Sequence, residues 1–490
     1  MLPTLYRGSL ALLTDLYQLT MAYGYWKQRR ADRLATFHLF FRKLPFSGGY
    51  AVAAGLELAL EYVRQFRFDE DDLQYLATLR GNDERPLFEE EFFDYLAELR
   101  FTGDIDAITE GTLVFPNEPL VRVTAPLLIA QLLETPLLNL INFSTLVATK
   151  SARICQAARG EPVLEFGLRR AQGIDGGLTG TRAAYIGGVA ATSNVLAGKL
   201  LGIPVRGTHA HSWVMAYGDE REAFADYAEV MPNNCVFLVD TYDTLDGVRH
   251  AIEVGQDLRK RGHQLAGIRL DSGDLAYLSI EARRLLDDAG FAEAAIVGSS
   301  DLDEHVIQSL KQQGAQISIW GVGTRLATAY DQPALGGVYK LAAIQNEAGQ
   351  WEHRIKLSEQ RIKTTIPGRL QVRRFLQAGQ VAGDLMYDEL LGEPDVTAIF
   401  DPADPIRRKK LPANLESESL LLPVVRQGEV VYASPTLAEM QARTKSQLAQ
   451  FHPSVLRLLN PHSYPVGLDK NLFRRREQLI REAHGWREEV

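Results

Sequence analysis

Between about residue 160 and residue 345 the chain repeats one hydrophobic pattern. A short apolar run ends in a polar turn, and a stretch with apolar residues at helical spacing follows. The runs are EPVLEF, IPVRGT, CVFLVD, LAGIRLD, AAIVGS and QISIWG, with VYKLAAI as a candidate seventh. Three of them begin at Cys235, Leu265 and near Ala294, a spacing of about 30 residues that suits a strand followed by a crossover helix. The pattern predicts a parallel sheet or a (β/α) barrel.

The flanking segments have a mixed pattern. Near the N-terminus, helical LLTDLYQLTMAYGYW alternates with strand-like TFHLFF and LVFPNEPLVRVTA. The stretch TPLLNLINFSTLVATKSARICQAA is helical in spacing and should end at Arg159-Gly160, where glycine tolerates the left-handed cap. We therefore predict three segments: 1–130 and 346–490 as the two parts of one α+β domain, and 131–345 as the barrel domain.

Three features are predicted in the C-terminal segment. The run VVRQGEVVY favours a hairpin that turns at Gln427-Gly428. A helix should follow Ser434 as N-cap and Pro435 at its first position. The proline-rich residues 401–414 are expected to form an exposed loop, and the last 40 or so residues carry no recognisable chemistry beyond a charged helical tail.

Composition narrows the function classes. The net charge of −9 over 490 residues argues against broad binding of nucleic acid or of anionic membranes. The N-terminus lacks the basic start and apolar core of a signal peptide, and apolar runs fall short of the roughly 18 residues that span a bilayer. Cys155 and Cys235 cannot build a disulfide framework or a thiolate zinc site. We expect a cytoplasmic protein.

Polar side chains follow each predicted strand, at the edge where parallel sheets bind ligands. Arginines follow the first run and lie in RLDSGD, histidines follow IPVRGT, and aspartates follow CVFLV and LAGI. Glycine turns with free N–H groups follow AAIV and ISIW. Taken singly, each has an ordinary structural explanation, such as helix capping by Asp271 or Asp274. Together they favour a site for a phosphorylated, anionic substrate with a metal ion.

The pair His209 and His211 in GTHAHSW allows a second class of enzyme. Because a strand places residues i and i+2 on one face, both could bind one metal, as in metal-dependent amidohydrolases. That enzyme class needs further histidine ligands at later strand ends, and the later strand ends here offer none. A non-catalytic scaffold, the third class, would leave the polar strand ends unexplained.

Seven longer motifs point to one family. They are TDLYQLTM (14–21), FFRKLPFSGGY (40–50), EFGLRRAQG (165–173), GTHAHSW (207–213), RLDSGD (269–274), GVGT (321–324) and KLSEQRIKTTIPG (356–368). In these motifs the chain resembles the nicotinate phosphoribosyltransferases, over about residues 10–450. The resemblance implies an α/β fold: a (β/α) barrel-like type II phosphoribosyltransferase domain plus a mixed α+β domain from the N- and C-terminal segments. It also implies an ATP-coupled, ligase-type reaction of nicotinate with phosphoribosyl pyrophosphate, for NAD salvage, with Mg²⁺ and in a homodimer.

The resemblance also implies roles for residues. His211 would be the phosphorylated histidine, while His209 occupies a variable position and receives no role. Asp240 and Asp271 would face the ribose and Mg²⁺, with Asp271 as metal ligand. Nicotinate would contact Phe166, Arg169, Thr208 and Arg269. The 5′-phosphate would lie on Gly298, Ser299, Gly321, Gly323 and Thr324. The second subunit or a closing domain would supply Tyr17, Arg42, Lys356, Lys363 and Thr365.

Elementary chemistry agrees with this assignment. The pyridine nitrogen of nicotinate has no proton to lose, so the reaction needs no general base. Carboxylates suit a cationic transition state at the ribose, and Mg²⁺ with Arg or Lys suits a leaving pyrophosphate. An arginine suits the carboxylate of nicotinate, whereas nicotinamide would favour a neutral or acidic partner. Nicotinamide phosphoribosyltransferase remains the alternative within the same fold.

Overall fold

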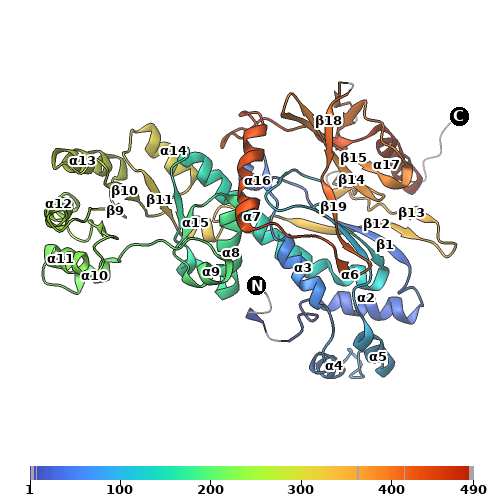
Figure 1. Ribbon diagram of the computed structural model, residues 1–490. Helices are drawn as coiled ribbons and strands as arrows, with labels where there is room; N and C mark the ends of the chain where they lie inside the picture. Colours follow the sequence, from blue (N-terminus) through green and yellow to red (C-terminus); the bar gives the residue numbers. More distant parts are fainter. Residues whose placement is uncertain (2–4, 7, 361–362, 405, 413, 485–490) are drawn as a thin grey trace. The chain divides into compact units, whose positions relative to one another are not determined.

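A computed structural model describes residues 1, 5–6, 8–360, 363–404, 406–412 and 414–484 (Figure 1). It divides into two compact units: unit 1 comprises residues 1–146 and 334–490, and unit 2 comprises residues 147–333. The long helix α7 (Glu134–Ala158) runs through the first boundary. The sequence-based limits of 131 and 345 for the barrel domain thus lie outside those of unit 2.

Unit 2 is built on a six-stranded sheet in the order β7-β6-β11-β10-β9-β8, in which all five neighbouring strand pairs are parallel. The strands are β6 (Val163–Glu165), β7 (Ala191–Thr192), β8 (Val236–Leu238), β9 (Gly267–Leu270), β10 (Ala295–Gly298) and β11 (Ile319–Val322). Helices alternate with them: α8 (Gly173–Gly187), α9 (Val195–Leu201), α10 (His211–Met215), α11 (Glu220–Val230), α12 (Thr244–Lys260), α13 (Leu275–Asp288), α14 (Glu304–Gln312) and α15 (Thr324–Ala327). This alternation confirms the predicted α/β class.

Five of the six predicted runs are strands, but IPVRGT is not. Only Val205 makes an isolated parallel bridge, to Thr192 of β7. Pro204 has no N–H to donate to a ladder and Gly207 has no side chain to pack, so the run cannot continue as a strand. The strand at this place is instead the unpredicted two-residue β7.

The seventh candidate, VYKLAAI, belongs to unit 1. It lies in β12 (Gly337–Gln345), which pairs antiparallel with β1 (Leu34–Phe41). The seven-stranded sheet of unit 1 has the order β13-β12-β1-β5-β3-β19-β20. Its remaining strands are β13 (Trp351–His353), β5 (Val121–Pro126), β3 (Asp104–Ile108), β19 (Leu421–Arg426) and β20 (Glu429–Val430). N- and C-terminal segments therefore share one sheet, as the mixed α+β prediction requires.

A second sheet of unit 1 comes from the C-terminal segment, in the order β17-β16-β21-β15-β14-β18. Its strands are β14 (Leu370–Gln377), β15 (Gln380–Asp388), β16 (Ala398–Phe400), β17 (Arg408–Lys410), β18 (Glu416–Ser419) and β21 (Val466–Leu468). β16 and β17 border and enter residues 401–414, so these residues are not the simple loop that was predicted. Residues 405 and 413 lie outside the described part.

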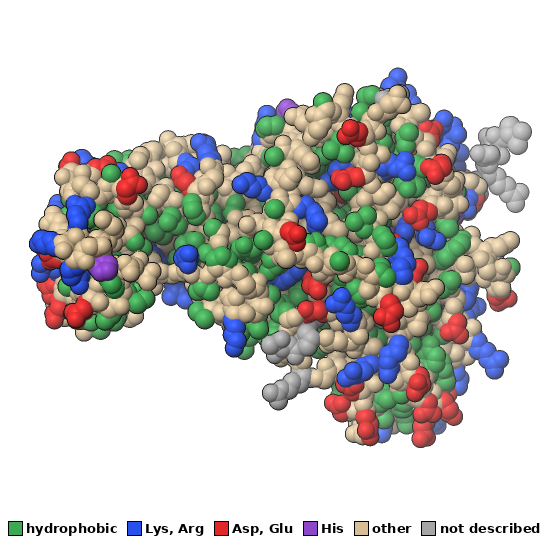
Figure 2. Space-filling view, viewed as in Figure 1, with side chains coloured by type: hydrophobic (Ala, Val, Ile, Leu, Met, Phe, Trp, Pro, Cys, Tyr) green, Lys and Arg blue, Asp and Glu red, His purple; other side chains and the backbone are tan. Residues whose placement is uncertain are grey.

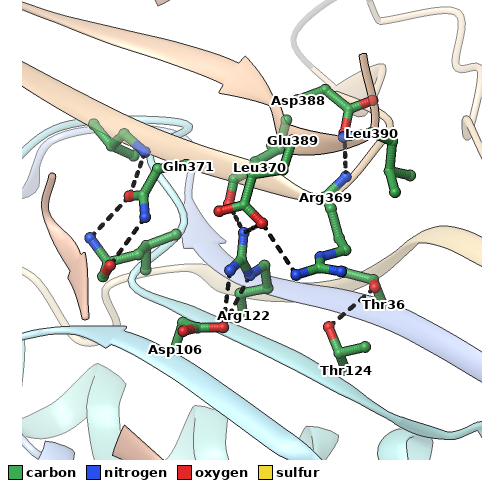
Figure 3. A network of polar contacts seen from close by, with 12 residues as sticks. Thr36, Asp106, Arg122, Thr124, Arg369, Leu370, Gln371, Asp388, Glu389 and Leu390 are labelled. Atoms are coloured by element: carbon green, nitrogen blue, oxygen red, sulfur yellow. Dashed lines mark hydrogen bonds and ion pairs between the residues drawn. The ribbon is translucent and has the colours of Figure 1, made fainter. Parts of the chain in front are cut away.

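A buried polar network joins the two sheets of unit 1 (Figure 3). The Arg122 guanidinium on β5 donates to Asp106 at 2.9 Å and to the Leu370 carbonyl at 2.9 Å, and pairs with Glu389 at 3.0 Å. Glu389 also pairs with Arg369 at 3.1 Å. Because Arg122 is 3% exposed, its guanidinium is satisfied by these protein groups rather than by water.

The C-terminal predictions are confirmed in part. β19 and β20 form the hairpin, and Gln427 and Gly428 take left-handed φ values of 49° and 83° at its turn. Helix α16 (Leu437–Gln450), however, begins after Thr436, which forms a capping box with Glu439. Ser434 is not the N-cap, since its hydroxyl donates to Glu57 instead. A capping box satisfies two N–H groups at once, which explains the later start.

Two further features bear on exposure to solvent and lipid. One helical stretch, Leu127–Ala158, is long and apolar enough to cross a membrane, and 67% of its most apolar window is buried inside the protein, as in a core helix. In Figure 2, acidic side chains gather over α4 (Glu70–Ala77) and α5 (Glu90–Glu98) of unit 1. Elsewhere on that face basic and acidic groups are interspersed.

Candidate active site

Arg269, at the end of β9, organises the site in unit 2. Its guanidinium donates to the hydroxyls of Ser299 at 2.8 Å and Thr208 at 3.1 Å, and to the Asp271 carboxylate at 2.7 Å. These partners follow three different strands or loops, so one side chain fixes all of them. Its side chain is 16% exposed, and its guanidinium carbon lies 5.6 Å from the centre of the Phe166 ring. Four of the predicted residues are thus brought together around Arg269.

His211 lies between two carboxylates. Its Nε2 is 3.9 Å from Oδ1 of Asp240 and 3.8 Å from Oδ2 of Asp271. Its Nδ1 is 3.2 Å from the Thr241 hydroxyl, a contact that holds the ring in place. The histidine side chain remains 38% exposed, so the ring is accessible from solvent.

The two carboxylates differ in their surroundings. Asp240 is 1% exposed; its Oδ2 accepts from the Asp271 N–H at 2.9 Å and from Ser272 at 2.6 Å. Its buried Oδ1 has no hydrogen-bond partner among the described residues. Burial raises the pKa of Asp271, but the hydrogen bond from Ser299 and the charge of Arg269 outweigh it, so this pKa lies below its ordinary value. Asp271 is therefore an anion at neutral pH.

Glycine at position 321 leaves room for the Phe166 ring. A Cβ on Gly321 would meet the ring at 2.8 Å, and one on Gly167 would meet the Ala327 side chain at 2.3 Å. The Phe166 N–H donates to the Val322 carbonyl at 2.8 Å, which fixes the backbone beside Arg269. Arg169, three residues after Phe166 in a short 3-10 helix (Leu168–Arg170), is exposed.

The predicted phosphate turns lie at the ends of β10 and β11. Gly298 ends β10, and Ser299 is 2% exposed beneath Arg269. Ser300 adopts φ 119°, a strained conformation for a residue with a side chain. Gly323 precedes α15, and Thr324 is its first residue. Both turns therefore place backbone N–H groups at the same end of the sheet as His211.

Five predicted residues belong to unit 1. Burial raises the pKa of Tyr17, the second residue of α2 (Leu16–Lys27), whose side chain is 47% exposed. Arg42 lies with its guanidinium 5.7 Å from the Phe40 ring. Thr365 is buried, and its hydroxyl accepts from the Lys356 N–H at 2.9 Å. Lys363 is exposed, and its neighbours 361–362 lie outside the described residues.

Comparisons with known proteins extend over nearly the whole chain. The profile of the nicotinate phosphoribosyltransferase (NAPRTase) family matches residues 162–375, and those of its N- and C-terminal domains match residues 12–142 and 369–476. Nicotinate phosphoribosyltransferase of Bacillus subtilis is 47% identical over 480 residues, 97% of this chain and 96% of that protein. The chain belongs to the nicotinate phosphoribosyltransferase family.

The human member of the family is similar to this chain in both sequence and structure. Human nicotinate phosphoribosyltransferase is 36% identical, covering 94% of this chain and 95% of the human one. The crystal structure of human nicotinic acid phosphoribosyltransferase superposes with a TM-score of 0.82 at 34% identity, over 95% of this chain and 99% of that one. The barrel-like domain and the mixed α+β domain predicted for the nicotinate phosphoribosyltransferase fold are therefore confirmed.

Sequence reasoning missed two residues of this nicotinate phosphoribosyltransferase site. Glu165, 2% exposed at the end of β6, accepts from Thr181 at 3.0 Å, from Thr192 at 2.6 Å and from the Gly167 N–H. It fixes the turn that carries Phe166, and its place as the first residue of the EFGLRRAQG motif was the available signal. Thr241 follows Asp240 directly but resembled an ordinary turn residue.

Metal chemistry was also part of the prediction. No group of three or more His, Cys, Asp or Glu side chains in the described ranges is placed to hold a metal ion. His209 and His211 do not form a pair, because His209 is 8% exposed and directs its Nε2 to the Leu238 N–H at 3.2 Å. The amidohydrolase interpretation is not supported by this geometry.

Proposed function

We propose that the chain joins nicotinate to phosphoribosyl pyrophosphate, giving nicotinate mononucleotide and pyrophosphate. In this proposal ATP hydrolysis is coupled to the reaction through phosphorylation of His211, and the product enters NAD salvage. The observation that carries the proposal is that Asp240 and Asp271 converge on His211 at the ends of neighbouring strands, with Arg269 bonded to Asp271. The full-length similarity to relatives named nicotinate phosphoribosyltransferase supports it.

Arg269 is the group that would bind the nicotinate carboxylate. A guanidinium has five N–H donors, and three of them are committed to Ser299, Thr208 and Asp271. Two N–H groups remain, as many as a bidentate carboxylate contact uses. Phe166 beside Arg269 offers a flat apolar face for the pyridine ring. Nicotinamide lacks the negative charge, so this arrangement favours nicotinate.

The carboxylates of Asp240 and Asp271 would stabilise the cationic ribose as the bond to pyrophosphate breaks. Oδ1 of Asp240 accepts no hydrogen bond from the described residues, and it lies 3.9 Å from Nε2 of His211, with Oδ2 of Asp271 at 3.8 Å from the same atom. These two oxygens suit Mg²⁺, which takes one or two carboxylates together with water and substrate phosphates. When bound, the ion would neutralise charge on the pyrophosphate. The ribose 5′-phosphate would lie on the turns at Gly298, Ser299, Gly321, Gly323 and Thr324.

Phosphorylation of His211 would change the local charge. A phosphoryl group adds between about −1.5 and −2 charges, next to carboxylates at 3.8 and 3.9 Å. That arrangement is repulsive unless a cation lies between them, so the phosphorylated state should favour binding of Mg²⁺ with phosphoribosyl pyrophosphate. Energy from ATP would in this way be converted into substrate affinity.

His211→Ala tests the coupling. Incubation with radiolabelled ATP should label the unsubstituted protein and leave the variant unlabelled. ATP should lower the KM for phosphoribosyl pyrophosphate only in the unsubstituted protein. If ATP still raises substrate affinity in His211→Ala, the role of His211 is refuted. Turnover of nicotinate and nicotinamide, each with and without ATP, decides the substrate, and a preference for nicotinamide would overturn the assignment.

The residues of unit 1 would act through a homodimer. Tyr17, Arg42, Lys356, Lys363 and Thr365 are proposed to complete the site from the second subunit or a closing domain. Helix α2 exposes Leu16, Tyr17 and Met21 by 55%, 47% and 40%, which suits an interface. Sedimentation at low concentration tests the dimer, and a monomer with full activity would exclude shared sites.

A further inference from the structure

The segment that carries Thr208 and His211 lies beside the last strand of the unit 2 sheet without forming a strand itself. On one side Val205 bridges Thr192, and the Arg206 N–H donates to the Thr192 carbonyl at 2.9 Å. On the other side lies β8, which pairs with β9 along its opposite edge. The free edge of β8 presents N–H groups that no strand of this sheet satisfies.

The His209 ring satisfies one of these groups. Its Nε2 accepts a hydrogen bond from the Leu238 N–H at 3.2 Å. A backbone N–H is always a donor, so Nε2 carries no proton and the hydrogen of the neutral ring is on Nδ1. Nδ1 lies 3.4 Å from the Ala210 carbonyl, where it can donate. Both ring nitrogens are therefore engaged, and the ring takes one tautomer and one orientation.

Aromatic side chains surround the ring. Tyr227 of α11 packs edge-on with ring centres 5.1 Å apart, and Phe224 and Phe237 lie at 6.0 and 6.3 Å. Burial lowers the pKa of His209, with the Ala210 hydrogen bond opposing it, and the ring is held neutral. The two hydrogen bonds and the aromatic packing together fix the backbone of residue 209 against β8.

This stretch of backbone carries Thr208 and His211, the two residues of the segment with proposed roles in the site. The Thr208 hydroxyl donates to the His209 carbonyl at 2.9 Å and accepts from Arg269 at 3.1 Å. Two residues after the ring, His211 begins α10 with its ring on Thr241. Any shift of residue 209 along the edge of β8 would move Thr208 away from Arg269 and His211 away from Asp240 and Asp271.

We propose that His209 is a positioning residue: its imidazole takes the place of a strand hydrogen bond and holds the Thr208–His211 segment on the edge of β8. The inference rests on the proposed function of His211 and deepens it. It assigns no proton transfer and no substrate contact to His209. Its role is to set the distance between His211 and the two carboxylates.

The test compares two replacements of similar size. In His209→Gln the side-chain carbonyl can still accept from Leu238, whereas His209→Phe fills the aromatic site without an acceptor. Tyr227→Leu is the matched control, since it loosens the packing around the ring and keeps the hydrogen bond. Each variant is compared in melting temperature, rate of His211 labelling by ATP, kcat and KM.

We expect His209→Phe to lose about tenfold or more in labelling rate and in kcat. We expect His209→Gln to recover most of both, and Tyr227→Leu to lose melting temperature with little change in kcat. Hydrogen exchange of the peptide containing Leu238 should accelerate in His209→Phe and remain slow in the glutamine variant. This exchange measurement needs no activity and can be made even where a variant is inactive.

Two results would overturn the inference. One is unchanged labelling and kcat in His209→Phe. The other is an equal loss in the glutamine and phenylalanine variants while the Leu238 peptide stays protected in both, because the acceptor would then be irrelevant. Failure of the proposed function appears differently: the unsubstituted protein would then show no labelling by ATP or no turnover of nicotinate, whereas the exchange difference would persist.

Discussion

Replacing Arg269 should lower kcat/KM for nicotinate much more than kcat/KM for nicotinamide. Its guanidinium donates to Thr208, Ser299 and the Asp271 carboxylate, and two of its five N–H groups remain for a substrate. In Arg269→Gln the charge is lost, and in Arg269→Lys the charge remains on a single nitrogen that cannot reach all of these partners. The two variants therefore distinguish charge from geometry.

The expected magnitude follows from the contacts. A hydrogen bond to a charged group contributes about 1.5–3 kcal/mol, so loss of two bonds to the substrate carboxylate should cost about 3 kcal/mol or more. Since each 1.4 kcal/mol is about tenfold, kcat/KM for nicotinate should fall by about a hundredfold in Arg269→Gln. We expect a smaller loss in Arg269→Lys, which keeps the charge without the bidentate geometry. For nicotinamide, a neutral base, the loss should be about tenfold or less.

The assay is steady-state turnover of both bases with saturating phosphoribosyl pyrophosphate and ATP. Arg259→Gln is the control, because that guanidinium covers Phe291 at 4.1 Å and donates to the Gly290 carbonyl at 2.9 Å, as a structural arginine of the same unit. Equal losses for nicotinate and nicotinamide in Arg269→Gln would refute the carboxylate role. An unchanged kcat/KM for nicotinate would refute it outright.

Three further perturbations test the packing at the site and the buried charges of the two units. Gly321→Ala places a Cβ 2.8 Å from the Phe166 ring, so kcat/KM should fall about tenfold, while Gly176→Ala, with nothing nearer than 4.0 Å, should change little. Glu304→Gln removes the buried carboxylate that pairs with Lys150 at 2.7 Å and with Arg153 at 2.8 Å. The free energy of unfolding, measured by urea titration, should therefore fall by about 3–5 kcal/mol. The control Glu253→Gln, which breaks an exposed ion pair, should lower it by only about 0–1 kcal/mol. Burial, aided by Arg122, lowers the pKa of His38 to about 3; the unfolded chain therefore binds the proton first, and stability should fall by about 1.4 kcal/mol per pH unit from about pH 6.5 downward, a slope that His38→Gln should remove.

The parallel sheet, and the grouping of the candidate residues at one end of it, could be predicted from sequence because strand ends carry a local signal. Each apolar run is bounded by its own polar turn, and parallel topology brings those turns together without any knowledge of packing. Arg269, Asp240 and Asp271 follow this rule. The sheet to which VYKLAAI belongs could not be predicted in this way. Its partner strand β1 lies some 300 residues away in sequence, and pairing between distant segments leaves no local pattern. The same holds for Glu165, whose partners Thr181 and Thr192 come from later elements.

The two histidines of GTHAHSW show why spacing alone misassigned a segment. The expectation of one shared face depended on a strand, and Pro204 and Gly207 end the strand geometry before His209 is reached. Once the backbone leaves the ladder, the edge of β8 needs another acceptor, and the His209 ring supplies it to Leu238. His211, by contrast, makes no hydrogen bond to the edge of β8 and lies partly exposed between Asp240 and Asp271. Under the positioning role proposed for His209, this hydrogen bond fixes the loop that places His211 at 3.8 and 3.9 Å from the two carboxylates, so the buried histidine determines where the exposed one lies.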